Sequence, residues 1–412
     1  MPVGPEVTRP RTAGVTSILI ATVVAGAAGY GLTWVVYRSA GPASYAGFAV
    51  FWAALYFVVG AVAGIQQEIA RASRPRDDGE PVDRARPAVF ATAVSLILIA
   101  AVLATSPLWA HAVFGEHGEL AVPLAIGVGG YALVATVAGL LYGVSQWRSI
   151  AAMIVVDAIL RLALVLIALL VHGDVTLLAW AVAVPFPLAL IVLWPFIRRG
   201  VVGRVQLDVR YRALLANVLR TLLASASTAL LVSGFPILIG VITRDDPAEL
   251  VGELIFTLTL TRAPLMVTVM ALQSYLVVLF RDTPGRVARR LLLAIGGAAV
   301  TLGALGWWLG PPVLTWVSGH ATSLGGGVIA SMVFSSALIA GLTVSGAALL
   351  ASSRHQAYAA GWLCAAVVTV LAISLPIGLV ERAVVAMIAG PATGIVVHVL
   401  TLARGRARRG RA

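Results

Sequence analysis

The chain has 412 residues and a formal net charge of +12; 60% of its residues are hydrophobic and 11% are charged. Soluble domains are about 45–50% apolar and roughly 25% charged, so a water-soluble domain is excluded. The mean hydropathy of +0.98 predicts an all-α polytopic membrane protein. Every basic residue is an arginine, scattered in short segments between apolar runs. This pattern indicates membrane topology, and we expect no nucleic-acid partner.

Twelve apolar segments are long enough to cross a bilayer, which takes about 20 residues per helix. The first is longer than a signal-peptide core of roughly 7–15 residues, so we expect it to be retained as a helix. The shortest polar joints are at 172–174 and 381–382. The predicted spans are 15–37, 45–66, 88–106, 120–144, 150–171, 175–197, 219–243, 251–280, 289–309, 328–351, 357–380 and 383–403.

The distribution of the arginines predicts how these twelve spans are oriented in the membrane. With both termini in the cytoplasm, twenty-four arginines lie on the cytoplasmic side and three on the other. Positive residues concentrate on the cytoplasmic side of membrane proteins, and a missed span would invert every later loop. We therefore predict a multi-pass protein of the cytoplasmic (inner) membrane with cytoplasmic N- and C-termini.

Six spans lie on each side of a hinge near residue 204. We predict an N-terminal lobe over 1–200, a cytoplasmic amphipathic linker over 201–218, a C-terminal lobe over 219–403 and a basic cytoplasmic tail over 404–412. Halves with an even number of spans have the same orientation, so the lobes would be parallel repeats around a central cavity.

A repeated motif supports the two-lobe prediction. Pro, Ala, Gly and Phe recur at the same spacing in segments 42–51 and 247–256, which are 205 residues apart. Each copy opens an even-numbered span, the second and the eighth. The copies also differ, because Phe48 corresponds to Glu253, and the later span adds Arg262. This asymmetry directs attention to the eighth span for substrate contact.

Charged residues inside spans are the strongest site candidates, because each one is costly without a partner or water. Asp157 and Arg161 are four residues apart and share a helix face. They either form a self-satisfying structural pair or line a hydrated cavity where Arg161 meets an anion. Arg262 has no acidic residue three or four positions away. It either lines the same cavity, where its paired donors suit phosphate oxygens, or bonds to helix carbonyls.

Further polar candidates are Gln66, Gln67 and Arg71 at the end of the second span, and Gln273 in the matching part of the eighth. They either line a path for a sugar headgroup or mark where the helices leave the bilayer. Without lysine there is no Walker-type phosphate loop, and no histidine pair has metal-ligand spacing. We therefore expect no enzyme activity, cofactor or metal.

A family resemblance emerges over about residues 15–75. The pattern Gly41-Pro42-x-x-Tyr45-x-Gly47-x-x-x-Phe51, followed by Gly64-Ile65-Gln66-Gln67-x-x-x-Arg71, resembles the polysaccharide flippase (Wzx-like) branch of the multidrug/oligosaccharidyl-lipid/polysaccharide exporter superfamily. The resemblance implies two six-helix lobes around a cationic cavity, to which Arg161 and Arg262 would contribute.

The resemblance also implies a function, the movement of a polyprenyl-pyrophosphate-linked glycan to the outer leaflet by alternating access. Partners would be this lipid-linked substrate, membrane lipids, and glycosyltransferases or a polymerase of the same pathway. Twelve spans argue against the fourteen-helix lipid II flippases.

Two other functions stay open at this point. A cation-coupled multidrug exporter is disfavoured by two arginines facing one aspartate, although Asp157 is the best candidate for coupling to a proton or Na⁺. A membrane-embedded glycosyltransferase or polymerase is disfavoured because the longest external loops, near 107–119 and 310–327, are short, and Glu116 and Glu119 are the only carboxylates in these two loops.

Overall fold

The computed structural model describes residues 12–75, 85–242, 246–262, 280, 286–352 and 354–409, and this part of the chain is helical nearly throughout. Nine helical stretches within it are long and apolar enough to cross a membrane. The helices of the first half are α1 (Thr12–Ala72), α2 (Pro87–Phe114), the 3-10 turn η1 (Gly118–Leu120), α3 (Ala121–Gly143), α4 (Trp147–Leu170), α5 (Val175–Ala183) and α6 (Pro185–Val201). Those of the second half are α7 (Tyr211–Ser233), α8 (Phe235–Ile242), a helix over 248–262, α10 (Arg286–Ser318), α11 (Gly326–Ala351), α12 (His355–Ile373) and α13 (Leu379–Arg409).

Each of the twelve predicted spans corresponds to a helix or a pair of helices, although the second half of 251–280 lies outside the described residues. α1 contains the first two spans, which meet at Gly41. Its φ of 80° and ψ of 167° break the helix, and only glycine adopts such angles without strain. Pro42 then begins the second helix, where its missing N–H costs nothing.

Several predicted boundaries are corrected. The last joint lies at residues 374–378 and not at 381–382, because α12 ends at Ile373 and α13 begins at Leu379. Pro376 lies in this joint, and proline disfavours helical backbone in the residue before it. α10 continues beyond the predicted end at 309, through Pro311 and Pro312, to Ser318. The predicted tail is helical as far as Arg409.

The segment that joins the halves contains a short strand. Strand β2 (Val205–Leu207) pairs antiparallel with β1 (Ser73–Pro75), and α7 begins at Tyr211. The backbone N–H of Asp208 donates to the Ala72 carbonyl at 2.9 Å. Val205 and Leu207 are buried in an apolar cluster of the N-terminal half. The linker is therefore fastened to the N-terminal half before the chain enters α7.

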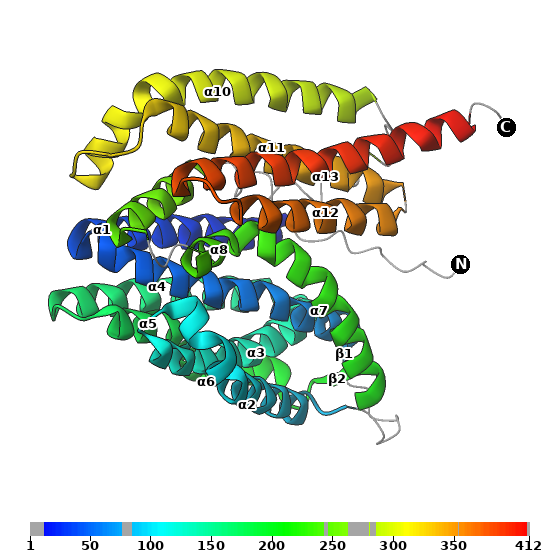
Figure 1. Cartoon of the computed structure of the whole chain (residues 1–412). Coiled ribbons are helices and arrows are strands. Elements are labelled where there is room, and N and C mark those ends of the chain that lie inside the picture. Colours follow the sequence, from blue (N-terminus) through cyan, green and yellow to red (C-terminus); the bar gives the residue numbers. More distant parts are fainter. Residues whose placement is uncertain are drawn as a thin grey trace.

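The helices lie side by side, with α2 to α6 on one side and α10 to α13 on the other (Figure 1). α1 and α7 pack along each other between these groups. Strands β1 and β2 and the C-terminal end of α13 lie at the same end of the bundle, which we call the basic end because Arg74, Arg204 and Arg354 are near it. The other end, with Arg38 and Arg382, we call the opposite end.

The two copies of the repeated motif meet near the opposite end. Each begins a helix, one after Gly41 and one at 248–262. Phe256 of the second copy stacks on Tyr37, with ring centroids 3.9 Å apart, and meets the edge of Tyr45 at 5.6 Å. A Cβ at Gly252 would collide with the carbonyl oxygen of Pro42. The motif thus builds a close contact between the two halves.

Candidate functional site

A cavity of about 550 Å³ lies among the helices of the N-terminal half. One face of α4 contributes Ile150, Met153, Asp157 and Arg161, spaced three or four residues apart as neighbours on a helix face are. The small residues of the first helix of α1 form another wall of the cavity, and Thr259 is the one described residue of the C-terminal half that lines it. The cavity runs from the middle of the bundle toward the basic end.

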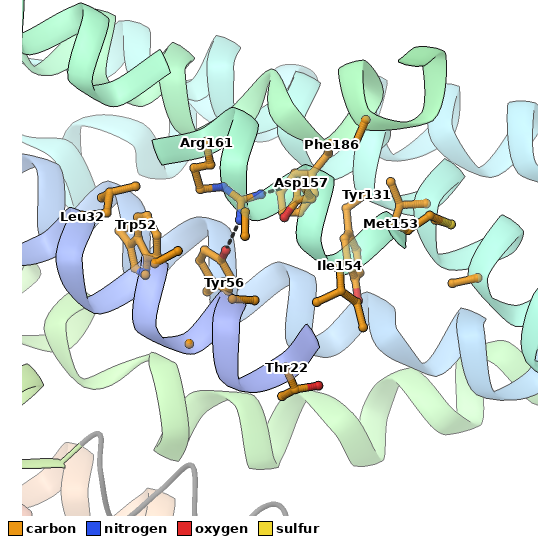
Figure 2. Close-up of a pocket in the computed structure, with 18 of the residues that line it drawn as sticks. Thr22, Leu32, Trp52, Tyr56, Tyr131, Met153, Ile154, Asp157, Arg161 and Phe186 are labelled. Carbon is orange, nitrogen blue, oxygen red and sulfur yellow. Dashed lines mark hydrogen bonds and ion pairs between the residues drawn. The ribbon is translucent and has the colours of Figure 1, made fainter. Parts of the chain in front are cut away.

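Asp157 and Arg161 form an ion pair in the wall of this cavity, as Figure 2 shows. The Asp157 Oδ1 accepts from Arg161 Nη2 at 2.7 Å. Arg161 also donates through Nη1 to the Tyr56 hydroxyl at 2.7 Å and through Nε to the Val182 carbonyl at 3.2 Å. Its guanidinium carbon lies 4.6 Å from the centroid of the Phe186 ring. Arg161 therefore ties together α1, α4, α5 and α6.

The two partners differ in how they face the cavity. The Arg161 side chain is 7% exposed and the Asp157 side chain 22%. Three of the five guanidinium N–H donors already have protein acceptors, whereas among the described residues the Asp157 carboxylate accepts one hydrogen bond, from Arg161. Arg161 thus holds helices together, and the carboxylate of Asp157 faces the cavity.

Sequence analysis missed the aromatic wall of the cavity. Trp52 and Tyr56 stack with ring centroids 4.8 Å apart on α1, and Tyr131 and Tyr142 line the cavity from one face of α3. The two members of each pair lie on the same face of their helix, because they are four residues apart in α1 and about three turns apart in α3. Such spacing is also typical of core aromatics, so the sequence alone does not identify a cavity.

A second cavity of about 230 Å³ lies between the halves and contains Arg262. The two cavities share Tyr30, Thr33, Trp52, Tyr56 and Thr259 as lining residues. Arg262 is 8% exposed, and its guanidinium carbon lies 5.9 Å from the centroid of the Phe235 ring. Arg161 and Arg262 therefore lie on either side of one aromatic wall.

The remaining predicted site residues are not brought together. Gln66 lines the larger cavity at its basic end. Neither Gln67 nor Arg71 lines it; both are exposed, and Arg71 pairs with Glu68 at 3.0 Å. Gln273 lies outside the described residues.

The two halves contact each other at the opposite end. Besides the stacked Tyr37 and Phe256, the Trp34 indole donates to the Val317 carbonyl at 2.7 Å. Arg382 of α13 pairs with Asp246 at 2.5 Å, which ties the second half to itself at this end. One apolar cluster here contains residues from both halves. The two halves are thus in contact at the opposite end, beside a groove that both of them line.

No protein-family model matches the sequence. A curated relative, uncharacterized protein Rv1510 of Mycobacterium tuberculosis, is 33% identical over 391 residues, which cover 93% of this chain and 90% of the relative. The chain belongs to the family of this mycobacterial protein.

Similar solved structures identify the fold of this chain. An inward-facing multidrug resistance MATE family transporter of the MOP superfamily matches with a TM-score of 0.69 and 16% identity, covering 96% of this chain and 97% of that one. The lipid II flippase MurJ, in an inward closed conformation, matches with a TM-score of 0.70 and 11% identity, covering 93% and 86%. The chain is therefore an all-α polytopic membrane protein with the fold of MOP superfamily transporters, and the predicted fold class is confirmed.

Proposed function

We propose that this protein is a flippase of the Wzx-like type, which moves a polyprenyl-pyrophosphate-linked oligosaccharide or polysaccharide precursor across the cytoplasmic membrane. The observation that carries the proposal is the charge of the two adjoining cavities. Their described lining contains Arg161, Arg262 and Asp157 as its only charged side chains, a net charge of +1. A cationic, mostly apolar cavity suits an amphipathic anion.

The alternative, an exporter of organic cations, is less well supported by the same lining. A cation would have to use Asp157, the sole carboxylate in the described walls of these two cavities. That carboxylate is already paired with Arg161, and a buried pair offers little net attraction to a further cation. The likeness to MATE structures concerns the fold and does not separate the two functions.

The arrangement also supports alternating access. The larger cavity reaches toward the basic end, which we predict to be cytoplasmic, and the halves contact each other at the opposite end through Tyr37 and Phe256 and through Trp34 and Val317. A substrate headgroup would enter from the cytoplasmic side. Separation of Phe256 from Tyr37, with closure of the basic end, would then release it on the other side.

The test is flipping in sealed vesicles that contain the purified chain and a polyprenyl-pyrophosphate-linked monosaccharide. A membrane-impermeant glycosidase reaches only the outer leaflet, so in protein-free vesicles about half of the lipid stays protected. We expect the chain to make nearly all of it accessible. Transport of ethidium without any flipping of the glycolipid would favour the cation exporter and refute the proposal.

A further inference from the structure

The larger cavity presents aromatic rings and uncharged hydrogen-bonding groups toward one another. Trp52 and Tyr56 form a stacked pair in the wall that both cavities share. Tyr30, Tyr131 and Tyr142 also line the larger cavity. Among the described residues, none of these three tyrosine hydroxyls has a hydrogen-bond partner. They can all donate to or accept from a ligand.

The charged groups of this cavity are already engaged with each other. Arg161 uses three of its five guanidinium N–H donors on Asp157, Tyr56 and Val182. It is therefore poorly placed to bind a phosphate. Asp157 keeps one carboxylate oxygen beyond the bond to Arg161, and its side chain is the more exposed of the two. The pair leaves a locally neutral wall with a spare acceptor.

Flat apolar faces bordered by hydroxyl groups and a carboxylate oxygen match the chemistry of a sugar ring. The C–H face of the ring packs on an aromatic side chain, and its hydroxyls need partners when they leave water. An organic cation would instead require net negative charge, which the Asp157–Arg161 pair does not provide. The volume of about 550 Å³ falls within the range of ligand pockets, roughly 300–1,000 Å³.

We infer that the larger cavity is the subsite for the sugar of the substrate, stacked on Trp52, while the pyrophosphate lies on the Arg262 side of the shared wall. This inference rests on the proposed function, and it assigns one part of the substrate to each of the two adjoining cavities. Arg161 becomes a positioning residue that holds Tyr56 and Asp157, and Trp52 becomes a specificity-determining residue.

The test compares two kinds of probe on the full-length chain in detergent. Farnesyl pyrophosphate carries no sugar, and a panel of farnesyl-pyrophosphoryl monosaccharides adds a hexose, an N-acetylhexosamine or a 6-deoxyhexose. We expect at least one sugar-bearing probe to bind wild type about tenfold more tightly than farnesyl pyrophosphate, a difference of about 1.4 kcal/mol. Trp52→Leu should abolish this advantage, so that the variant binds sugar-bearing and sugarless probes equally tightly.

Three further variants control for folding and for aromatic character. Trp52→Phe keeps a ring and should keep most of the advantage. Tyr131→Phe removes only a hydroxyl that has no described partner, and it should lower the advantage without loss of stability. Trp194, 41% exposed and in the lining of neither cavity, should tolerate Trp194→Leu with no change.

The outcomes separate the inference from the proposed function. Equal binding of sugar-bearing and sugarless probes to wild type, or equal weakening of both by Trp52→Leu, would overturn the sugar subsite alone. If no pyrophosphate probe binds more tightly than farnesol, the proposed function itself fails.

Discussion

Removing one partner of the Asp157–Arg161 pair should cost different amounts of stability, depending on which partner is removed. Asp157→Ala leaves the buried Arg161 cation with only the Tyr56 hydroxyl and the Val182 carbonyl. Breaking a buried pair costs about 3–5 kcal/mol. The Tyr56 hydroxyl and the Val182 carbonyl still accept from Arg161 and reduce this cost. We therefore expect Asp157→Ala to lower the free energy of unfolding by about 3 kcal/mol. Arg161→Met removes three hydrogen bonds, each worth about 0.5–1.5 kcal/mol, but it leaves a carboxylate that water in the cavity can reach, so we expect a smaller loss of about 2 kcal/mol.

The double variant makes the reasoning testable. Asp157→Ala with Arg161→Met contains no unpaired charge, so it should be more stable than Asp157→Ala alone. The assay is reversible unfolding in mixed micelles, followed by circular dichroism as sodium dodecyl sulfate is titrated. Additive effects of the two substitutions, or a larger loss for Arg161→Met than for Asp157→Ala, would show that Arg161 does not depend on Asp157 as the structure indicates.

Two further predictions concern transport. Gly29 lines the larger cavity and a side chain there meets open space, so Gly29→Leu should fold normally and slow flipping by about tenfold or more, the equivalent of about 1.4 kcal/mol. Gly31→Leu, also in open space but outside the described lining, is the matched control; equal rates in both variants would remove this wall from the path. Arg262→Ala should abolish flipping while gel filtration and the yield of membrane-inserted protein stay normal, and Arg262→Lys should restore it only in part, because lysine keeps the charge but loses the paired donors. Full activity of Arg262→Ala would exclude Arg262 from the mechanism.

The helices were largely predictable from the sequence because apolar length and arginine distribution act on a whole span at once. The ends of the helices were less predictable. The joint predicted at Glu381 and Arg382 lies several residues earlier, since Pro376 disturbs the backbone while charged residues are tolerated in the first turn of α13. β2 was missed because three residues alone carry no strand signal; pairing with β1, far away in sequence, creates it.

The site was predictable in part for a similar reason. Charge inside a span marks Asp157, Arg161 and Arg262, and the i, i+4 spacing predicts the pair that the structure shows. The sequence does not reveal that Arg161 reaches Tyr56 on α1, a contact across 105 positions. The aromatic wall was missed because a cavity depends on how several helices are spaced, and the sequence pattern of one helix does not indicate that spacing.

Alternating access is the central claim, and a reversible lock at the opposite end tests it most directly. Cysteines placed at Tyr37 and Phe256, whose rings are 3.9 Å apart, in a background where the single native Cys364 is replaced by alanine, should be joined by oxidation or a short bismaleimide. We predict that the cross-link stops glycolipid flipping in sealed vesicles, and that reduction of the disulfide restores it. Undiminished flipping by the fully cross-linked protein would contradict the account.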